Sequence, residues 1–232
     1  YNGVDRFNKQ SGEFESIEIK HSAKKMVSCI LVAKNSEVWI GLDDGLFKYD
    51  PKENMFIHHS QLGIGDIALT SSVKSIIEDT SGQILIGTSN DGIYQYSPSE
   101  NTFYSYPRMS TRNSAHVIYE DSKKNIWIGT RGEGLHLLEY PRDMENFRWK
   151  TYRHEPNNPA SLSDDIIYDI CEDINTNSLW IGTRGGLTTL EYNNPRGLIN
   201  WSTIPVMNQS PAKEIYSITR DNKDNIWIGT IG

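Results

Sequence analysis

A short apolar segment recurs along this chain, and its spacing limits what the chain can fold into. The copies occupy residues 38–42, 84–88, 126–130, 179–183 and 226–230, and each has Ile-Gly after a central Trp or Leu. The central residues, at positions 39, 85, 127, 180 and 227, lie 42 to 53 residues apart. That period fits a four-stranded blade of a β-propeller and is too long for the coil of a leucine-rich repeat.

Each copy has the same surroundings, which assign four strands, A to D, to a blade. Strand A contains an Ile nine or ten residues before the central residue of strand B. An Asp stands three residues after that Ile in all repeats but the first, where Ala33 takes its place. A Gly-containing turn then leads to strand C. Strand B is apolar at successive positions, which indicates burial on both faces between neighbouring blades. We therefore expect Trp39, Trp127, Trp180 and Trp227 to be buried at equivalent places, and the turn Asp to accept backbone N–H bonds.

The predicted fold is all-β, a β-propeller of four-stranded antiparallel blades. Residues 1–232 form one propeller segment with blade units at 1–22 (half), 23–62, 70–108, 114–154, 165–206 and 213–232 (half). The first half blade supplies strands C and D, and the last supplies A and B. Either the halves close a five-bladed ring or the chain is an arc of a seven-bladed ring. We favour the arc, because blade geometry is suited to a particular number of neighbours.

Composition narrows the classes of partner. The formal net charge is −7 without runs of Lys or Arg, which disfavours nucleic acid and anionic membrane surfaces as ligands of this segment. No apolar run is long enough to span a membrane. Because the first residue falls inside a repeat, we expect a piece of a longer protein. Cys29 and Cys171 lie at different repeat positions, so we expect no disulfide between them.

The segment from Tyr152 to Ile166 reads Tyr-Arg-His-Glu-Pro-Asn-Asn-Pro-Ala-Ser-Leu-Ser-Asp-Asp-Ile, and Leu-Trp-Ile-Gly-Thr ends at Thr183. Together with Gly-Leu-Phe-Lys-Tyr-Asp ending at Asp50 and Asp-Asn-Ile-Trp-Ile-Gly-Thr ending at Thr230, this resembles the two-component regulator propeller repeat. The repeat is typical of periplasmic sensors in hybrid two-component systems of gut Bacteroides. The resemblance covers essentially the whole chain.

The resemblance implies several properties of the full-length protein. Such sensors usually contain two seven-bladed propellers, a β-sandwich domain, one membrane helix, and cytoplasmic kinase and DNA-binding modules. They detect oligosaccharides and activate genes for their degradation. The resemblance thus implies a periplasmic location, an oligosaccharide ligand, the remaining blades and domains as partners, and a homodimer of the full-length protein.

Known catalytic and metal-binding motifs do not occur in the sequence, so we expect no catalytic residue, metal or cofactor in this segment. The pair His58-His59 is interpreted as solvated polar residues at the end of a strand D, in preference to a metal site. The turn from Asp221 to Asn225 superficially resembles a calcium loop but lacks its Gly and its final Glu, so a hairpin turn capped by Asp is preferred.

Candidate ligand contacts follow from propeller geometry, in which the D–A and B–C loops emerge on one face around the axis. From the B–C loops the candidates are Asp44, Asp91, Arg131, Glu133 and Arg184. The entrances of strand A supply His116, Tyr168 and Tyr216. Aromatic rings with carboxylates and Arg suit sugars, which present apolar C–H faces and hydroxyls. The alternative is that these are ordinary solvated turn residues.

The function favoured by the sequence is a non-catalytic extracytoplasmic sensor segment that recognises a glycan or oligosaccharide. One alternative is a propeller lyase or hydrolase acting on polysaccharide, which requires acid–base groups converging on one face. Another alternative is a protein-interaction propeller of a secreted or surface protein.

Overall fold

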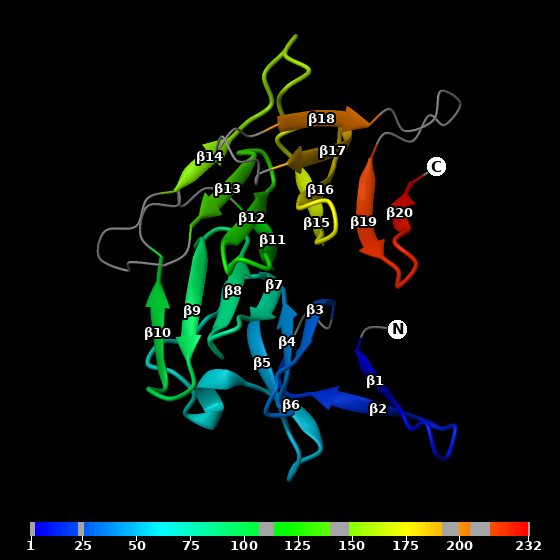
Figure 1. Ribbon diagram of the computed structural model, residues 1–232. Coiled ribbons are helices and arrows are strands. Elements are labelled where there is room, and N and C mark those ends of the chain that lie inside the picture. Colours follow the sequence, from blue (N-terminus) through cyan, green and yellow to red (C-terminus); the bar gives the residue numbers. More distant parts are fainter. Residues whose placement is uncertain are drawn as a thin grey trace. The chain divides into compact units, whose positions relative to one another are not determined.

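The computed structural model describes residues 3–22, 26–106, 114–139, 149–191, 200–204 and 214–231. These residues form twenty β-strands and one short 3-10 helix (Figure 1). The chain divides into two compact units, residues 1–114 and residues 115–232. No helix in the described part of the chain is long and apolar enough to cross a membrane.

Unit 1 contains two sheets. The first comprises β1 (Val4–Phe7), β2 (Phe14–Ile19), β3 (Val27–Val32), β4 (Val38–Leu42), β5 (Gly45–Asp50) and β6 (Met55–His58), in the order β1-β2-β6-β5-β4-β3. The 3-10 helix η1 (His59–Leu62) follows β6. The second sheet comprises β7 (Val73–Glu78), β8 (Ile84–Thr88), β9 (Ile93–Ser97) and β10 (Thr102–Ser105), in chain order.

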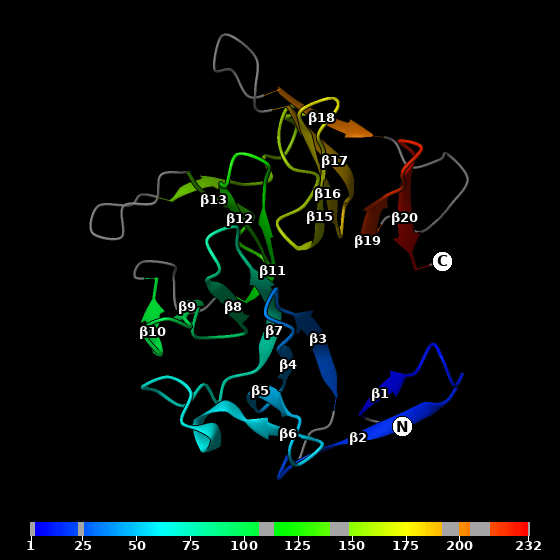
Figure 2. The same ribbon diagram turned by 60° about the horizontal axis from the view of Figure 1, so that its bottom comes forward.

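Unit 2 contains two four-stranded sheets and one two-stranded sheet (Figure 2). The first comprises β11 (Ala115–Glu120), β12 (Ile126–Thr130), β13 (Leu135–Leu138) and β14 (Lys150–Tyr152). The second comprises β15 (Ile167–Asp173), β16 (Ser178–Thr183), β17 (Gly186–Glu191) and β18 (Asn200–Ile204), and the last comprises β19 (Ile215–Arg220) and β20 (Ile226–Thr230). The predicted all-β fold of four-stranded antiparallel blades is confirmed, with strands A to D in sequence order.

The two half blades have different surroundings. β1 pairs with β2, and the end of β2 runs parallel to β6, with Glu18 opposite Met55 and Ile19 opposite Phe56. This parallel pair departs from the purely antiparallel expectation. It places Ile17 and Ile19 over β4, β5 and β6, where both are buried. β19 and β20 form a two-stranded sheet of their own, which contains no strand of the first sheet, and the arc stays a prediction.

Close packing between consecutive blades depends on the glycine of strand B. A Cβ atom added at Gly41 would lie 2.6 Å from Cγ1 of Val73 in the next strand A. At Gly129 it would lie 2.5 Å from Cγ2 of Ile167. Real Cβ atoms do not approach other atoms so closely, so only glycine allows the next sheet to lie this near.

Burial of the strand B tryptophans depends on the sheet that follows. Trp39 and Trp127 are 0% exposed, and each packs in a core cluster with the following four-stranded sheet. Trp180 is followed only by the two-stranded sheet and is half-buried. Trp227 lies in that last sheet and is 62% exposed. The expectation that all four are equally buried was therefore wrong for Trp180 and Trp227, because a neighbouring sheet, rather than the repeat itself, covers the indole.

The turn between strands A and B is held by the repeated Asp. The carboxylate of Asp121 accepts bonds from the N–H groups of Lys123 and Asn125 and from Nε1 of Trp127, at 2.8 to 2.9 Å. Asp221 makes the same set of bonds with Lys223, Asn225 and Trp227. The predicted Asp-capped turn is confirmed.

Two repeats lack this bond to the indole. Ala33 takes the place of the Asp before Trp39, and the turn before Trp180 is longer by one residue. Nε1 of Trp39 and Nε1 of Trp180 are both buried without a hydrogen-bond partner among the described residues. Each such donor costs free energy, because water no longer satisfies it.

Truncation of equivalent tryptophans should therefore have unequal effects. We expect Trp127→Ala to lower the free energy of unfolding by about 3–5 kcal/mol, as for other large buried side chains. Trp227→Ala in the same unit should lower it by less than about 1 kcal/mol, because this side chain is largely exposed. Equilibrium urea unfolding of both variants measures the difference. Equal losses would contradict the conclusion that the following sheet determines how far each indole is buried.

Introducing the missing carboxylate should stabilise the first blade. The turn at Ala33 already has the same backbone hydrogen bonds as the turn at Asp121. The equivalent residues Ser36 and Lys124 also share a positive φ, of 68° and 67° respectively. We expect Ala33→Asp to raise the free energy of unfolding by about 1 kcal/mol by giving Nε1 of Trp39 an acceptor. The matched control, Asp121→Ala, should lower it by about 1–3 kcal/mol. Chemical denaturation of both variants tests the pair, and a destabilised Ala33→Asp variant would count against it.

Candidate functional site

Strand A carries a β-bulge near its first residue in all five sheets in which it is described. The extra residue in the A–B ladder is Ser28, Lys74, His116, Tyr168 or Tyr216. A bulge leaves one residue outside the regular pairing and redirects its side chain. The structure thus confirms that His116, Tyr168 and Tyr216 occupy equivalent positions, although their contact with a ligand stays a prediction.

The B–C turns contact the residues that lead into strand A of the same blade. Asp44 accepts a bond from Oγ of Ser22 at 2.9 Å, and Asp91 accepts one from Oγ of Ser71. In unit 2 the guanidinium of Arg184 pairs with Asp164 at 3.1 Å. Three of the predicted residues, Asp44, Asp91 and Arg184, thereby hold their own turns in place while lying at the surface.

In unit 1 a B–C turn also reaches the following blade. Asp43 accepts bonds at 2.8 Å from Oγ of Ser72 and from Nζ of Lys74, the bulge residue of β7. We call Ser22, Asp43, Asp44, Ser71, Ser72, Lys74 and Asp91 the unit 1 turn surface. Its three carboxylates already accept hydrogen bonds from Ser or Lys side chains, so a ligand at this surface would compete with internal bonds.

In unit 2 the bulge residues form an aromatic row. The rings of Tyr168 and Tyr216 are stacked, with centroids 4.3 Å apart and an interplanar angle of 17°. The ring of His116 meets Tyr168 edge-on at 5.8 Å. His116 and Tyr168 are half-buried, whereas Tyr216 is 40% exposed. Tyr216 is therefore the most exposed ring of the row, and one face of it packs against Tyr168.

Glu214 fixes the orientation of this row. Its Oε2 accepts bonds from the hydroxyls of Tyr168, at 3.0 Å, and of Tyr216. These two bonds hold the pKa of Glu214 below its ordinary value, and the bond to Glu214 raises the pKa of Tyr216. Glu214 is not among the residues predicted from the sequence. The sequence feature that could have identified Glu214 is its place immediately before strand A, close to an aromatic bulge residue.

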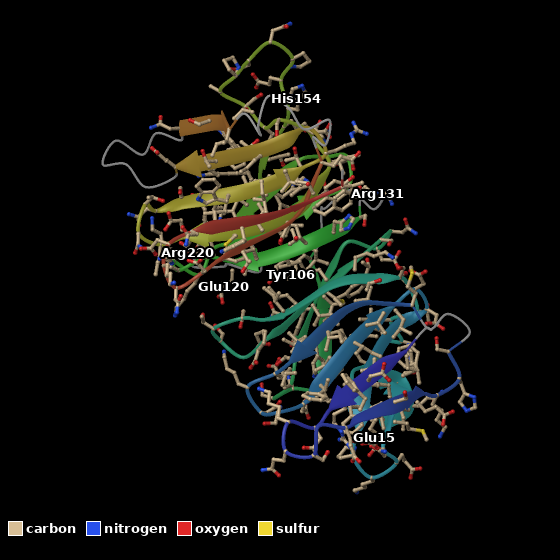
Figure 3. The ribbon with its side chains drawn as sticks, turned by 90° about the vertical axis from the view of Figure 1, so that its right-hand side faces the viewer. Glu15, Tyr106, Glu120, Arg131, His154 and Arg220 are labelled. Carbon is tan, nitrogen blue, oxygen red and sulfur yellow. The ribbon has the colours of Figure 1, made fainter. Side chains whose placement is uncertain are left out.

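The remaining candidates in unit 2 lie at the same ends of the strands as the aromatic row. Arg131 is exposed, and its backbone forms an isolated antiparallel β-bridge with Ile166, which precedes the next strand A. Glu133 pairs with Arg153 at 3.3 Å. Figure 3 places Arg131 at one end of the unit 2 strands and Glu120 and Arg220 at the opposite end. We call His116, Arg131, Glu133, Arg153, Asp164, Tyr168, Arg184, Glu214 and Tyr216 the unit 2 turn surface.

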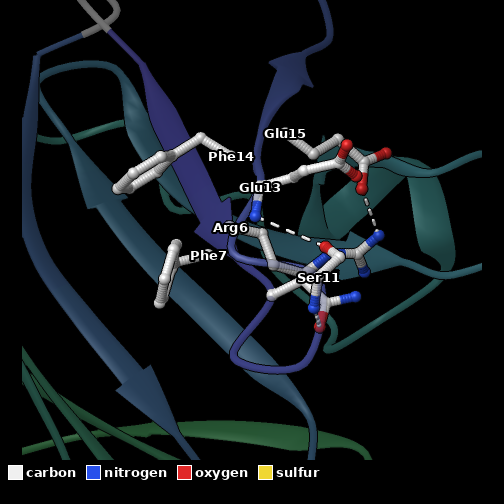
Figure 4. A pocket seen from close by; sticks show the side chains of 7 residues that line it. Arg6, Phe7, Ser11, Glu13, Phe14 and Glu15 are labelled. Carbon is white, nitrogen blue, oxygen red and sulfur yellow. Dashed lines mark hydrogen bonds and ion pairs between the residues drawn. The ribbon is translucent and has the colours of Figure 1, made fainter.

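A hollow of about 400 Å³ lies at the tip of the β1–β2 hairpin (Figure 4). The rings of Phe7 and Phe14 stand 4.8 Å apart beside it, and Arg6 pairs with Glu15 at 2.6 Å. The tip is a C–D turn and so belongs to the strand ends opposite the B–C turns. Both the aromatic pair and the ion pair are largely exposed, and the hollow includes no predicted ligand residue.

The interpretation of His58 and His59 as solvated was wrong for His59. His59 is 0% exposed, and burial lowers its pKa to about 4. His58 is half-buried, and its Nε2 lies 3.0 Å from the carbonyl oxygen of Leu69. The repeat pattern could not reveal this burial, because His59 lies beyond strand D in a D–A connection, and these connections differ in length and sequence between blades. Among the described residues no group of His, Cys, Asp and Glu is arranged to hold a metal ion.

Removal of Glu214 should release the tyrosine hydroxyls. Without this acceptor, the pKa of Tyr216 in the Glu214→Ala variant should fall toward the ordinary tyrosine value of 10.0. NMR titration of the ring Cζ in protein with labelled tyrosine measures the change. Glu191→Ala, which removes an exposed carboxylate of β17, is the control and should leave the Tyr216 titration as in the wild type. An unchanged Tyr216 pKa in Glu214→Ala would exclude hydrogen bonding between these two side chains.

Three segments of the chain match a known repeat family. Residues 110–132, 161–185 and 209–232 match the family described as "Two component regulator propeller". The matched segments include the A–B hairpins of the three sheets in unit 2. No curated protein matches the chain in sequence.

Solved structures share the fold. The extracellular domain of a proposed hybrid two component system from B. thetaiotaomicron is 25% identical with a TM-score of 0.67, and the alignment covers 98% of this chain and 29% of that one. A second such domain from the same organism is 20% identical with a TM-score of 0.70, again over 98% and 29%. This chain therefore spans less than a third of the length of these relatives.

An enzyme shares the fold as well. Virginiamycin B lyase from Staphylococcus aureus is 16% identical with a TM-score of 0.67, and the alignment covers 98% of this chain and 70% of the lyase. At this identity the likeness concerns the fold alone.

Proposed function

Because three segments of this chain match the two component regulator propeller family, we propose that it is part of an extracytoplasmic sensor and that it recognises an oligosaccharide on the unit 2 turn surface. The extracellular domains of hybrid two component systems share its fold, which supports a sensor role. The proposed location is the periplasm, with the signal passing to other domains of the same polypeptide. Further blades and domains of that polypeptide, and its second copy in a dimer, are the proposed partners.

The observation that supports sugar recognition is the aromatic row at the strand A bulges. An exposed ring suits stacking against the C–H face of a sugar, and neighbouring polar groups suit its hydroxyls. Tyr216 supplies that ring, and its stack with Tyr168 and its bond to Glu214 hold it in one orientation. A ring that is fixed before binding loses little conformational entropy when the ligand arrives. Arg131 and Glu133 lie at the same strand ends and offer donors and acceptors for hydroxyl groups.

The lyase alternative rests on the shared fold with virginiamycin B lyase. Catalysis by acid–base chemistry requires titratable groups that face a common substrate position. In the unit 2 turn surface the carboxylates of Asp164, Glu133 and Glu214 are each engaged by Arg or Tyr partners. This pairing favours binding over proton transfer, so the sensor is preferred to the enzyme.

Binding is tested by thermal unfolding against a panel of plant and host oligosaccharides. A ligand at about 100 times its Kd should stabilise the folded chain by about 2.7 kcal/mol, seen as a higher Tm. Tyr216→Ala should abolish that rise. Tyr104→Ala is the matched control, because Tyr104 is also 40% exposed but lies on β10 in unit 1.

The outcomes separate the alternatives. A rise in Tm that is lost in Tyr216→Ala and kept in Tyr104→Ala, without change in the oligosaccharide, supports the proposed sensor. Shortened or unsaturated products in chromatography of the same mixtures would establish the lyase or hydrolase instead. If no member of the panel raises Tm, the proposal for this segment fails and the protein-interaction propeller becomes the better explanation.

A further inference from the structure

His59 holds the connection between the first two blades of unit 1. The ring is completely buried at the end of β6, and both of its nitrogens are bonded to that connection. Nδ1 lies 2.7 Å from the carbonyl oxygen of Ile64, and Nε2 lies 3.0 Å from the backbone nitrogen of Leu69. One side chain therefore fixes two points of the segment between η1 and β7.

These two partners determine the protonation state of the ring. The backbone N–H of Leu69 can only donate, so Nε2 of His59 must accept and carries no proton. The carbonyl oxygen of Ile64 can only accept, so Nδ1 carries the proton. The ring is neutral in this arrangement. A second proton on Nε2 would face the N–H of Leu69, and the bond between them would be lost.

Leu69 links this histidine to the B–C turn of the first blade. Its side chain is 3% exposed in the core cluster that contains Trp39. Its carbonyl oxygen lies 3.0 Å from Nε2 of His58 and accepts a bond from the N–H of Leu46 at 3.3 Å. A Cβ atom at Gly45 would clash with that same oxygen. Displacement of Leu69 would therefore loosen both the connection and the turn.

The surroundings of His59 disfavour a charged ring. The ring of His58 lies 4.7 Å away and is the adjacent titratable group, so charge on both rings would be repulsive. From β10 the ring of Phe103 meets His59 edge-on at 5.1 Å. Asp66, the acidic residue of the connection, accepts a bond from the backbone of Phe103 at 3.0 Å. Burial is the main cause that lowers the pKa of His59, and the Ile64 bond opposes it in part.

From this geometry we infer that His59 makes this connection sensitive to acid. Protonation of its ring breaks the bond to the backbone N–H of Leu69 and opens the connection from residue 59 to residue 72. The inference is independent of the proposed oligosaccharide function, because it concerns the chain without a ligand. It assigns a regulatory role to a residue that the repeat pattern does not explain.

The direction of the pH effect follows from linkage. The pKa of His59 is about 4 in the closed state against an ordinary value of 6.5, so the open state binds the extra proton more tightly between these values. The closed state is therefore most stable above the ordinary pKa and loses stability as the pH falls toward the lower value. From about pH 7.5 to about pH 5 the opening equilibrium constant should increase roughly 30-fold.

Amide hydrogen exchange of the whole 232-residue chain measures this opening directly. The protection factor of the Leu69 amide should fall roughly 30-fold from about pH 7.5 to about pH 5, after correction for the intrinsic exchange rate. The amide of Ile128 in β12 of unit 2 should keep its protection factor. A constant protection factor at Leu69 would overturn the inference.

Two variants assign the effect to one ring. His59→Gln removes the titrating group, so its Leu69 protection should no longer depend on pH, whereas His58→Gln should keep the dependence of the wild type. A pH dependence that persists in His59→Gln would overturn the inference. If His59→Gln does not fold, NMR titration of the wild-type imidazole decides, because a pKa near the ordinary value would show that burial does not hold the ring neutral.

Discussion

The contact between strand B of one blade and the sheet that follows it is the interaction on which the rest of this structure depends. Its glycine lets the next strand A approach the backbone, as at Gly41 and Val73. Its large side chain then lies under the next sheet, as Trp39 does. Burial of apolar surface is the main favourable term in folding, and the core clusters around Trp39 and Trp127 each join residues of two neighbouring sheets.

This dependence explains which features the sequence could predict. The strands, the Asp-capped turn and the equivalence of the bulge residues are properties of one repeat, and the pattern around Trp127 contains them all. The burial of Trp180 and Trp227 is a property of two adjacent sheets. The same indole is therefore covered at Trp127 and largely exposed at Trp227. A repeat pattern describes each blade as if both of its neighbours were present.

The candidate site shows the same division. Tyr168 and Tyr216 could be selected from the sequence because they share a repeat position. Glu214, which orients both rings, stands outside the repeated positions and was found only from the hydrogen bonds. His59 is a stronger case, since the D–A connection that buries it differs in length or sequence from those of the other blades. Repeats thus provide the framework, and departures from the repeat provide the particular chemistry.

The order of the strands has a consequence for how the chain acquires its structure. Within each unit every four-stranded blade is built from strands that follow one another in sequence, and blades that are consecutive in the chain pack on each other. Contacts between residues that are close in sequence are formed at small entropic cost. Once the sheet β11–β14 has formed, the strands that follow it can pack directly against its apolar face. The polypeptide can therefore be assembled from its beginning to its end as it leaves the ribosome, without waiting for distant segments.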